Sequence, residues 1–214
     1  MSFIGVESNF NVMLYAELAE TYERLEATTK RLEMISILAE LFKDAKPEEL
    51  EKVIYLTQGK IHPDWMGEPE IGIAEKMALE AIARATGLER SDVDAMMAEE
   101  GDIGRVAERA LTEKKIRSLF YKPLTVEEVY ETLDAIAKES GKGSAGRKIE
   151  RFIGLLANAT PREARYLART VVGTLRLGVG DMTILDALAL AYTGSTESRP
   201  VSYTHLTLPT KAAV

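Results

Sequence analysis

Apolar residues recur every three or four positions along most of this chain, and this spacing limits its possible folds more than any other feature. Near the start it is shown by Leu14, Leu18, Tyr22 and Leu25, within a helical pattern that continues to Asp44. Such spacing places apolar side chains on one face of an α-helix. Strand-like alternation is weak, and no succession of strands and helices suggests a parallel sheet. The sequence therefore predicts an all-α fold, a compact multi-helix domain.

Residues that start and stop helices divide this pattern into segments joined by short loops. Pro47 stands at a first-turn position, and Gly59 and Gly87 close helices. Thr125 and Glu128 have the spacing of a capping box. Five residues are expected to be N-caps, because their side-chain oxygens can accept hydrogen bonds from the first free amides of a helix: Ser91, Asp102, Thr125, Thr160 and Asp181.

The helical pattern covers residues 13–199, which we expect to form one domain. Residues 1–12 show no helical period and are expected to be an extension outside it. Residues 200–214 also depart from the pattern, since the stretch VSYTHLTLPT back-translates to a string that resembles the end of a transposon-based sequencing adapter. We expect this tail to be non-native, which would leave His205 without a role.

One loop, GKIHPDWMGEPEIG, interrupts the helical pattern at residues 59–72. His62 has no second histidine nearby, so we expect a packed loop residue rather than a metal ligand or a catalytic base. Trp65 is expected to be an anchor that pins the loop to the helices.

Composition excludes several classes of function. The 214 residues include no cysteine and two histidines, which excludes disulfide scaffolds and thiolate metal sites and disfavours a histidine-rich metal centre. The motifs G-x-x-x-x-G-K-[ST], G-x-S-x-G and H-E-x-x-H are missing from the sequence. No apolar run approaches the roughly 20 residues that a membrane span needs, and no secretory signal is evident. We expect a cytoplasmic protein without a catalytic or metal site in this chain.

The net charge of −7 conceals a gradient along the chain. Residues 1–100 carry 10 basic and 21 acidic side chains, whereas residues 138–176 carry 9 basic and 3 acidic ones. A phosphate backbone responds to the local field rather than to the total charge. The second stretch is therefore a candidate surface for nucleic acid, although a solvated charged face would have the same composition.

Within that stretch, GKGSAGRKIERF places three glycines around the start of a helix expected to begin near Ser144. Glycines leave backbone amides open to a phosphate, and a helix N-terminus directs further amides and a positive dipole end at the same anion. Positive charge would come from Lys142, Arg147, Lys148 and Arg151. A flexible connector explains the same loop equally well.

A second glycine-rich turn, LGVGD, follows a helix expected after Thr160. Two such loop-to-helix units fit a surface that touches two backbone segments of a duplex. A blander alternative is that Gly173 and Gly178 permit close helix packing or a C-cap. Four arginines have spacings of three, four and seven, which predicts a column along one side of the helix: Arg162, Arg165, Arg169 and Arg176.

Five separated blocks occur in this order: LAETYERLEATTKRLEMISILAELF, QGKIHPDWMGEPEIGIAEK, GDIGRVAER, GKGSAGRKIERFIGLL and VVGTLRLGVGDMTILDALALA. Together they resemble the N-terminal DNA-binding domain of archaeal-type ATP-dependent DNA ligases, over about residues 13–199. The resemblance implies an all-helical module that grips the minor groove on both sides of a nick and helps the rest of the enzyme to encircle the duplex. It also implies a role in DNA replication, repair and recombination.

The resemblance implies which residues face DNA. The loop at Gly143 and Ser144 would meet backbone phosphates, and Thr174 would belong to a second DNA-facing turn. Residue chemistry and the resemblance together give the expected DNA-contacting set: Lys142, Gly143, Ser144, Arg147, Lys148, Arg151, Arg169, Thr174, Arg176, Gly178 and Gly180.

A ligase of this kind forms a covalent lysyl–AMP on a K-x-D-G motif in a nucleotidyltransferase domain that follows the DNA-binding domain. Neither that motif nor any Asp-Gly dipeptide occurs in this sequence. The resemblance therefore implies ATP and Mg²⁺ for a full-length parent with its catalytic domains in cis, and no cofactor for this chain. We expect this chain to bind nicked double-stranded DNA and to seal nothing.

Two other functions remain open on the sequence alone. An all-α protein-interaction scaffold with incidental basic loops would show no DNA binding even at low salt. A helical base-excising glycosylase would act on damaged DNA without ATP, but the sequence has no catalytic Asp or Lys in a recognisable motif.

Overall fold

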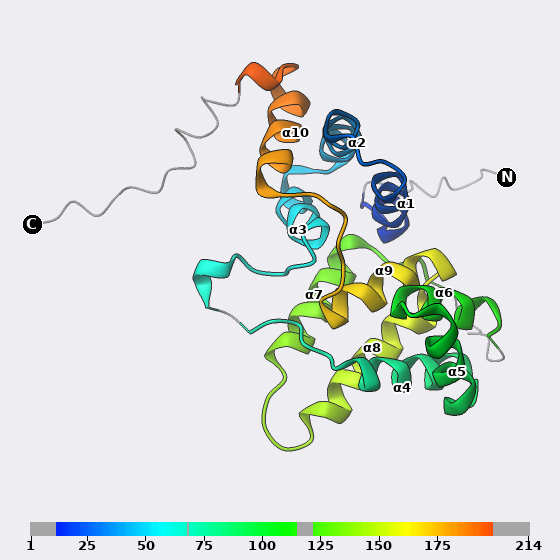
Figure 1. The fold of residues 1–214 in the computed structure, drawn as a ribbon. Coiled ribbons are helices and arrows are strands. Elements are labelled where there is room, and N and C mark those ends of the chain that lie inside the picture. The colour runs from blue at the N-terminus through cyan, green and yellow to red at the C-terminus, as the bar shows by residue number, and fades with distance from the viewer. Residues whose placement is uncertain (1–11, 68, 115–121, 199–214) are drawn as a thin grey trace, which may run out of the picture.

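The computed structural model describes residues 12–67, 69–114 and 122–198, and within these ranges it has ten α-helices and no β-strand (Figure 1). This confirms the predicted all-α fold. Within the described residues, no helix is long and apolar enough to cross a membrane. Residues 1–11 and the tail from 199 to 214, with His205, lie outside the described residues.

The helices are α1 (Tyr15–Glu26), α2 (Arg31–Asp44), α3 (Pro47–Thr57), α4 (Glu75–Thr86), α5 (Arg90–Glu100), α6 (Ile103–Thr112), α7 (Val126–Lys138), α8 (Ser144–Asn158), α9 (Pro161–Val172) and α10 (Asp181–Thr193), with short 3₁₀ helices η1 (Asp64–Met66) and η2 (Thr196–Ser198).

The helices pack around one continuous apolar core. In Figure 1, α1, α2, α3 and α10 lie above α4 to α9, with α10 packed along α2, α6 along α9 and α4 along α8. α1 contacts both α2 and α9 and so joins the two groups. Large side chains from both groups are fully buried in the core: Tyr22, Phe42, Leu133, Phe152 and Tyr166.

The long helical pattern of residues 14–44 forms two helices rather than one. Residues 27–30 separate α1 from α2, and Thr28 Oγ1 accepts a hydrogen bond from the amide of Lys30 at 3.1 Å. Leu14, expected on the helix, is extended and forms an isolated bridge with Thr125. A local hydroxyl-to-backbone hydrogen bond competes with helix continuation, which explains the break.

Three of the five predicted N-caps are confirmed. Asp102, Thr125 and Thr160 each accept a hydrogen bond from a backbone amide in the first turn of the following helix. The prediction is wrong for Ser91 and Asp181, because Glu89 is the N-cap of α5 and Gly180 is the N-cap of α10, so both predicted caps lie inside the first turn of their helix. Asp181 instead accepts a hydrogen bond from Gln58 Nε2 at 2.7 Å.

The loop at residues 59–72 is fixed at its base but not by Trp65. His62 Nε2 lies 2.6 Å from Asp134 Oδ1 of α7, which confirms a packed loop histidine. Ile61 and Ile71 are buried. Trp65 is 72% exposed, so its predicted anchoring role is wrong; instead, two buried isoleucines and the contacts of His62 with Asp134 and of the Ile61 carbonyl with Tyr130 hold the loop.

Candidate nucleic-acid interface

The first glycine-rich unit is the start of α8. Gly143 is its N-cap and has a φ of 81°, a left-handed backbone that favours glycine. The amide of Ser144 donates to the carbonyl of Gly141 at 3.2 Å. No side chain caps the helix, and among the described residues the amides of Ala145 and Gly146 have no acceptor. These exposed amides can therefore donate to an external anion.

The N-terminus of α8 differs in charge from those of the other helices. Each of the other nine α-helices in the described ranges has a carboxylate at its N-cap or in its first turn. α8 has a glycine cap, no acidic residue in its first turn, and Arg147 and Lys148 immediately after it. The positive end of this helix dipole is therefore left without an internal anion.

Glu139 orders the basic side chains beside this loop. Its two carboxylate oxygens accept hydrogen bonds from Arg147 Nε at 2.6 Å and from Arg151 Nε at 3.1 Å. These hydrogen bonds hold the pKa of Glu139 below its ordinary value. Arg147 also donates to the carbonyls of Ser140 and Lys142, at 3.0 and 3.2 Å. Arg147 thus fixes the shape of the loop rather than lying free on it.

The second unit is the turn between α9 and α10. α9 ends at Val172, where Gly173 has a φ of 77° and donates its amide to the carbonyl of Thr170 at 3.1 Å. The amide of Thr174 donates to the carbonyl of Arg169 at 2.8 Å. This pair of bonds is a Schellman C-cap, as the alternative interpretation of Gly173 expects. Gly178 also has a positive φ, of 70°.

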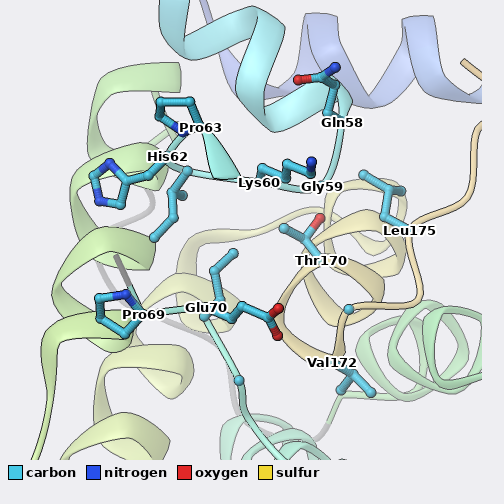
Figure 2. A pocket seen from close by; sticks show the side chains of 14 residues that line it. Gln58, Gly59, Lys60, His62, Pro63, Pro69, Glu70, Thr170, Val172 and Leu175 are labelled. Carbon is cyan, nitrogen blue, oxygen red and sulfur yellow. The ribbon is translucent and has the colours of Figure 1, made fainter. Parts of the chain in front are cut away.

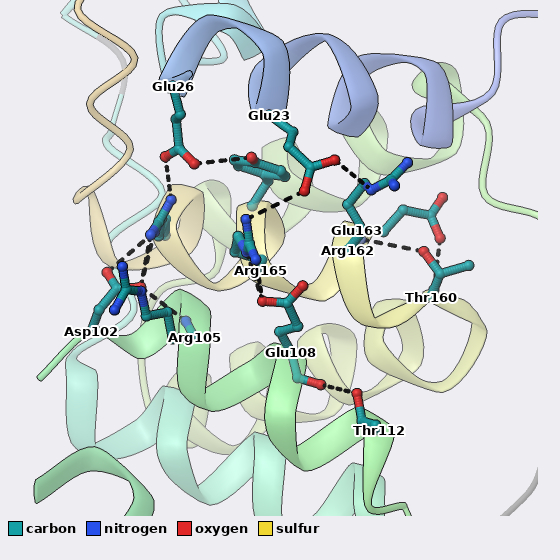
Figure 3. A network of polar contacts seen from close by, with 12 residues as sticks. Glu23, Glu26, Asp102, Arg105, Glu108, Thr112, Thr160, Arg162, Glu163 and Arg165 are labelled. Carbon is teal, nitrogen blue, oxygen red and sulfur yellow. Dashed lines mark hydrogen bonds and ion pairs between the residues drawn. The ribbon is translucent and has the colours of Figure 1, made fainter. Parts of the chain in front are cut away.

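The predicted column of four arginines on one helix is wrong, because α9 ends before Arg176. Arg162 and Arg165 instead face carboxylates of α1 and α6 (Figure 3). Arg162 Nε lies 3.0 Å from Glu23 Oε2, and Arg165 Nε donates to Glu108 Oε2 at 2.8 Å. These arginines join helices to one another.

Arg169 is the most buried of the three arginines of α9, with 14% of its side chain exposed. Its guanidinium binds Glu26 of α1 and donates to Asp102 Oδ1 at 2.9 Å. α6 can pack this closely against α9 because Gly104 has no side chain. A Cβ at that position would lie only 2.8 Å from the carbonyl oxygen of Arg165. Arg169 thus lies next to the second unit, and its backbone carbonyl accepts a hydrogen bond from the amide of Thr174 in that unit.

Asp102 makes the stability of this network depend on pH. Burial alone would raise its pKa, but hydrogen bonds from Arg169 and from the amide of Arg105 outweigh burial and lower the pKa below 3.8. A lowered folded-state pKa stabilises the protein above the unfolded-state pKa, and this contribution is lost as pH falls through the folded value. We expect Asp102→Asn to destabilise the protein at pH 7 and the deficit to shrink below about pH 4. Urea unfolding of the wild type and the variant at pH 7 and pH 3 measures this difference in the free energy of unfolding. An equal difference at both pH values would contradict the prediction.

The 59–72 loop lies between the two units. A cavity of about 480 Å³ separates it from the turn after α9 and is lined by residues that include Gly59, His62, Pro69, Thr170 and Leu175. Figure 2 shows His62 and Pro69 on one side of this cavity and Leu175 on the opposite side. In Figure 1 the loop before α8 lies below η1 and the N-terminus of α10 lies above it, so the two units are not in contact.

Most of the basic side chains in residues 138–176 form ion pairs with carboxylates. Lys138, Arg147, Arg151, Arg162, Arg165 and Arg169 all pair with carboxylates. Among the described residues, Lys142, Lys148 and Arg176 have no ion-pair partner. The described ranges also contain no group of three or more acidic or histidine side chains able to hold a metal ion. The sequence predicted these three cations and also predicted backbone amides open to an anion at this helix start; the structure identifies two of those amides as belonging to Ala145 and Gly146.

Comparisons with known proteins agree over most of the chain. The model of the family described as DNA ligase N terminus matches residues 14–189. The chain is 45% identical to a DNA ligase of Staphylothermus marinus, over 88% of this chain and 34% of that relative. It is 48% identical to DNA ligase 2 of Thermofilum pendens, over 87% and 32%, and 41% identical to a DNA ligase of Acidianus ambivalens, over 88% and 33%. The chain thus spans about a third of the length of the curated relatives it matches.

Proposed function

Because the chain belongs to the DNA ligase N-terminal family, we propose that it is the module with which a longer ATP-dependent ligase holds nicked double-stranded DNA. In this proposal the ATP, the Mg²⁺ and the lysine nucleophile belong to catalytic domains joined in cis. This chain binds the duplex through its phosphates and does not seal the nick.

The observation that carries the proposal is the N-terminus of α8. Nine helices in the described part of the chain place a carboxylate at their positive end, and α8 places two open amides there beside Lys142 and Lys148. A helix that stabilises its own N-terminus with a carboxylate repels phosphate, whereas this one attracts it. Open amides and neighbouring cations can bind a phosphate backbone without reading the base sequence.

The turn after α9 supports the proposal as a second phosphate-binding unit through its cation, and not through the N-terminus of α10, whose first turn carries Asp181. Arg176 is exposed, and among the described residues its guanidinium has no ion-pair partner. Thr174, Gly178 and Gly180 are also exposed in the same turn. We name the two units together the DNA-facing surface: residues 141–148 and 173–180. Arg151 helps to shape the first unit through Glu139, and Arg169 supports the second from below.

Binding of nicked duplex, intact duplex and single-stranded DNA at several salt concentrations tests the proposal. Labelled DNA reports affinity through fluorescence anisotropy, and labelled ATP reports adenylation in a parallel assay. We expect salt-sensitive duplex binding, because displaced counterions make affinity fall with salt, and no transfer of label to the protein. Absence of DNA binding at low salt would favour the protein-interaction scaffold.

Arg176→Ala and Lys148→Ala should each weaken duplex binding about equally for all sequences. Each should also reduce the slope of log affinity against log salt by about one, because each removes one phosphate contact. Lys43→Ala, which removes an exposed cation on α2, is the matched control and should leave the slope unchanged. A variant with wild-type affinity and slope would remove that residue from the DNA-facing surface.

A further inference from the structure

The 59–72 loop carries an apolar tip that the core does not use. Trp65 is 72% exposed and the adjacent Met66 is 51% exposed, both on the 3₁₀ helix η1. In Figure 1 η1 stands at the edge of the molecule, apart from the α-helices. These two neighbouring apolar side chains are therefore accessible to a binding partner.

The base of this loop is rigid, which makes the tip a fixed projection. Ile61 is 3% exposed, and Ile73, just after the loop, is 2% exposed and donates its amide to the carbonyl of Val171 at 3.0 Å. His62 is held by Asp134, and Tyr130 Oη of α7 donates to the carbonyl of Ile61. A side chain on such a base can contact a partner without first losing the entropy of a free loop.

The same contacts place the tip between the two phosphate-binding units. On one side, α7 holds His62 and leads directly into the loop that starts α8. On the other side, Gly59 approaches the second unit so closely that a Cβ there would lie 3.3 Å from Leu175 Cβ. A duplex that lies across both units therefore passes over η1.

We propose that Trp65 and Met66 form an apolar wedge that enters the minor groove and stacks at the nick. This inference rests on the proposed function. Apolar wedges partly unstack a base step when they enter the minor groove, and an aromatic ring stacks on an exposed base. A nick interrupts one backbone strand, so the step at the nick opens with less resistance than an intact step.

The charge of the loop makes the wedge selective for the nick. From Pro63 to Gly72 the sequence contains no Lys or Arg and three acidic residues, Asp64, Glu68 and Glu70; the one lysine of the loop, Lys60, lies near its start. Carboxylates oppose contact with phosphates, so the tip gains binding energy only by reaching bases. An opened step at a nick provides accessible base surface, whereas a closed duplex provides little.

The chain has one tryptophan, so emission excited at wavelengths that its eight tyrosines do not absorb reports on Trp65 alone. We expect saturating nicked duplex to quench this emission and to lower its Stern–Volmer constant for acrylamide about twofold or more, with a smaller change for intact duplex of the same sequence. Anisotropy of labelled DNA, measured on the same samples, reports binding independently. Bound DNA with unchanged emission and unchanged acrylamide access would overturn the wedge and leave the proposed function standing. Absence of any anisotropy change would overturn both.

Trp65→Ala should weaken binding of nicked duplex about five- to hundredfold, with an unchanged salt slope, because a stacking contact and no phosphate contact is lost. Trp65→Phe should restore most of the affinity. Tyr192→Ala is the matched control, since Tyr192 is another exposed aromatic residue, on α10 and outside the DNA-facing surface. Circular dichroism verifies that each variant is folded. Equal affinity of Trp65→Ala and the wild type for nicked duplex would refute the wedge.

Discussion

Ser144→Asp should lower affinity for nicked duplex about tenfold or more while leaving the fold as stable as before or slightly more so. Ser144 is the first residue of α8, where an aspartate interacts favourably with the helix dipole and contributes about 0.3–1 kcal/mol. The same carboxylate would lie where we place a DNA phosphate, and two like charges a few ångströms apart near a surface repel by about 1–4 kcal/mol. Anisotropy with labelled duplex and urea unfolding measure the two effects separately.

Ser91→Asp is the matched control for this substitution. Ser91 is exposed in the first turn of α5, and the change in side chain and in net charge is identical. In Figure 1 α5 lies on the far side of the lower group from the loop that starts α8. An equal loss of affinity in both variants would show that the change in net charge alone weakens DNA binding. It would contradict a phosphate contact at the N-terminus of α8.

Arg169→Ala should reduce the free energy of unfolding by about 2–3 kcal/mol. The substitution leaves Asp102 and Glu26 without their shared cation, and removing one partner of a buried ion pair costs about 3–5 kcal/mol. The estimate is lower because both carboxylates keep 31% of their side-chain exposure and are partly hydrated. Chemical unfolding at pH 7 measures the difference.

Arg162→Ala is the control on the same helix. Its guanidinium pairs with Glu23 at the surface, and such exposed pairs contribute about 1 kcal/mol or less. If Arg169→Ala costs no more than Arg162→Ala, the network around Asp102 does not hold α6 and α9 together. The salt dependence of DNA binding adds a second readout: a slope reduced by about one in Arg169→Ala would mean that Arg169 contacts a phosphate directly.

Local signals in the sequence predicted the elements that local physics determines. Thr125 with Glu128, and Thr160 before Pro161, start helices because their own hydroxyls satisfy the first amides. The start of α8 near Ser144 was also predicted, and the structure shows that the preceding Gly143 has the left-handed backbone that glycine favours. One failure occurred where a tertiary partner competed: the carboxylate of Asp181 accepts from Gln58, which follows α3, instead of capping α10.

The charges of the candidate site show the limit of sequence reasoning more clearly. Residues 138–176 carry a basic excess in the sequence, yet the fold brings Glu23, Glu26, Asp102 and Glu108 from α1, α6 and the residue before α6 against the arginines of α9. A count along the chain cannot register carboxylates that arrive from 57 or more positions away. Trp65 was misplaced for a similar reason: the sequence cannot say whether a loop aromatic packs inward or projects outward.

The sequence by itself determined the all-α class, most helix boundaries and the two glycine-rich starts of helices, because apolar period and capping act within a few residues. Only the tertiary structure decided which cations remain unpaired and that Trp65 projects between the two units. Those properties depend on which surfaces meet after packing, and packing depends on the shape and charge of the whole core rather than on any one segment.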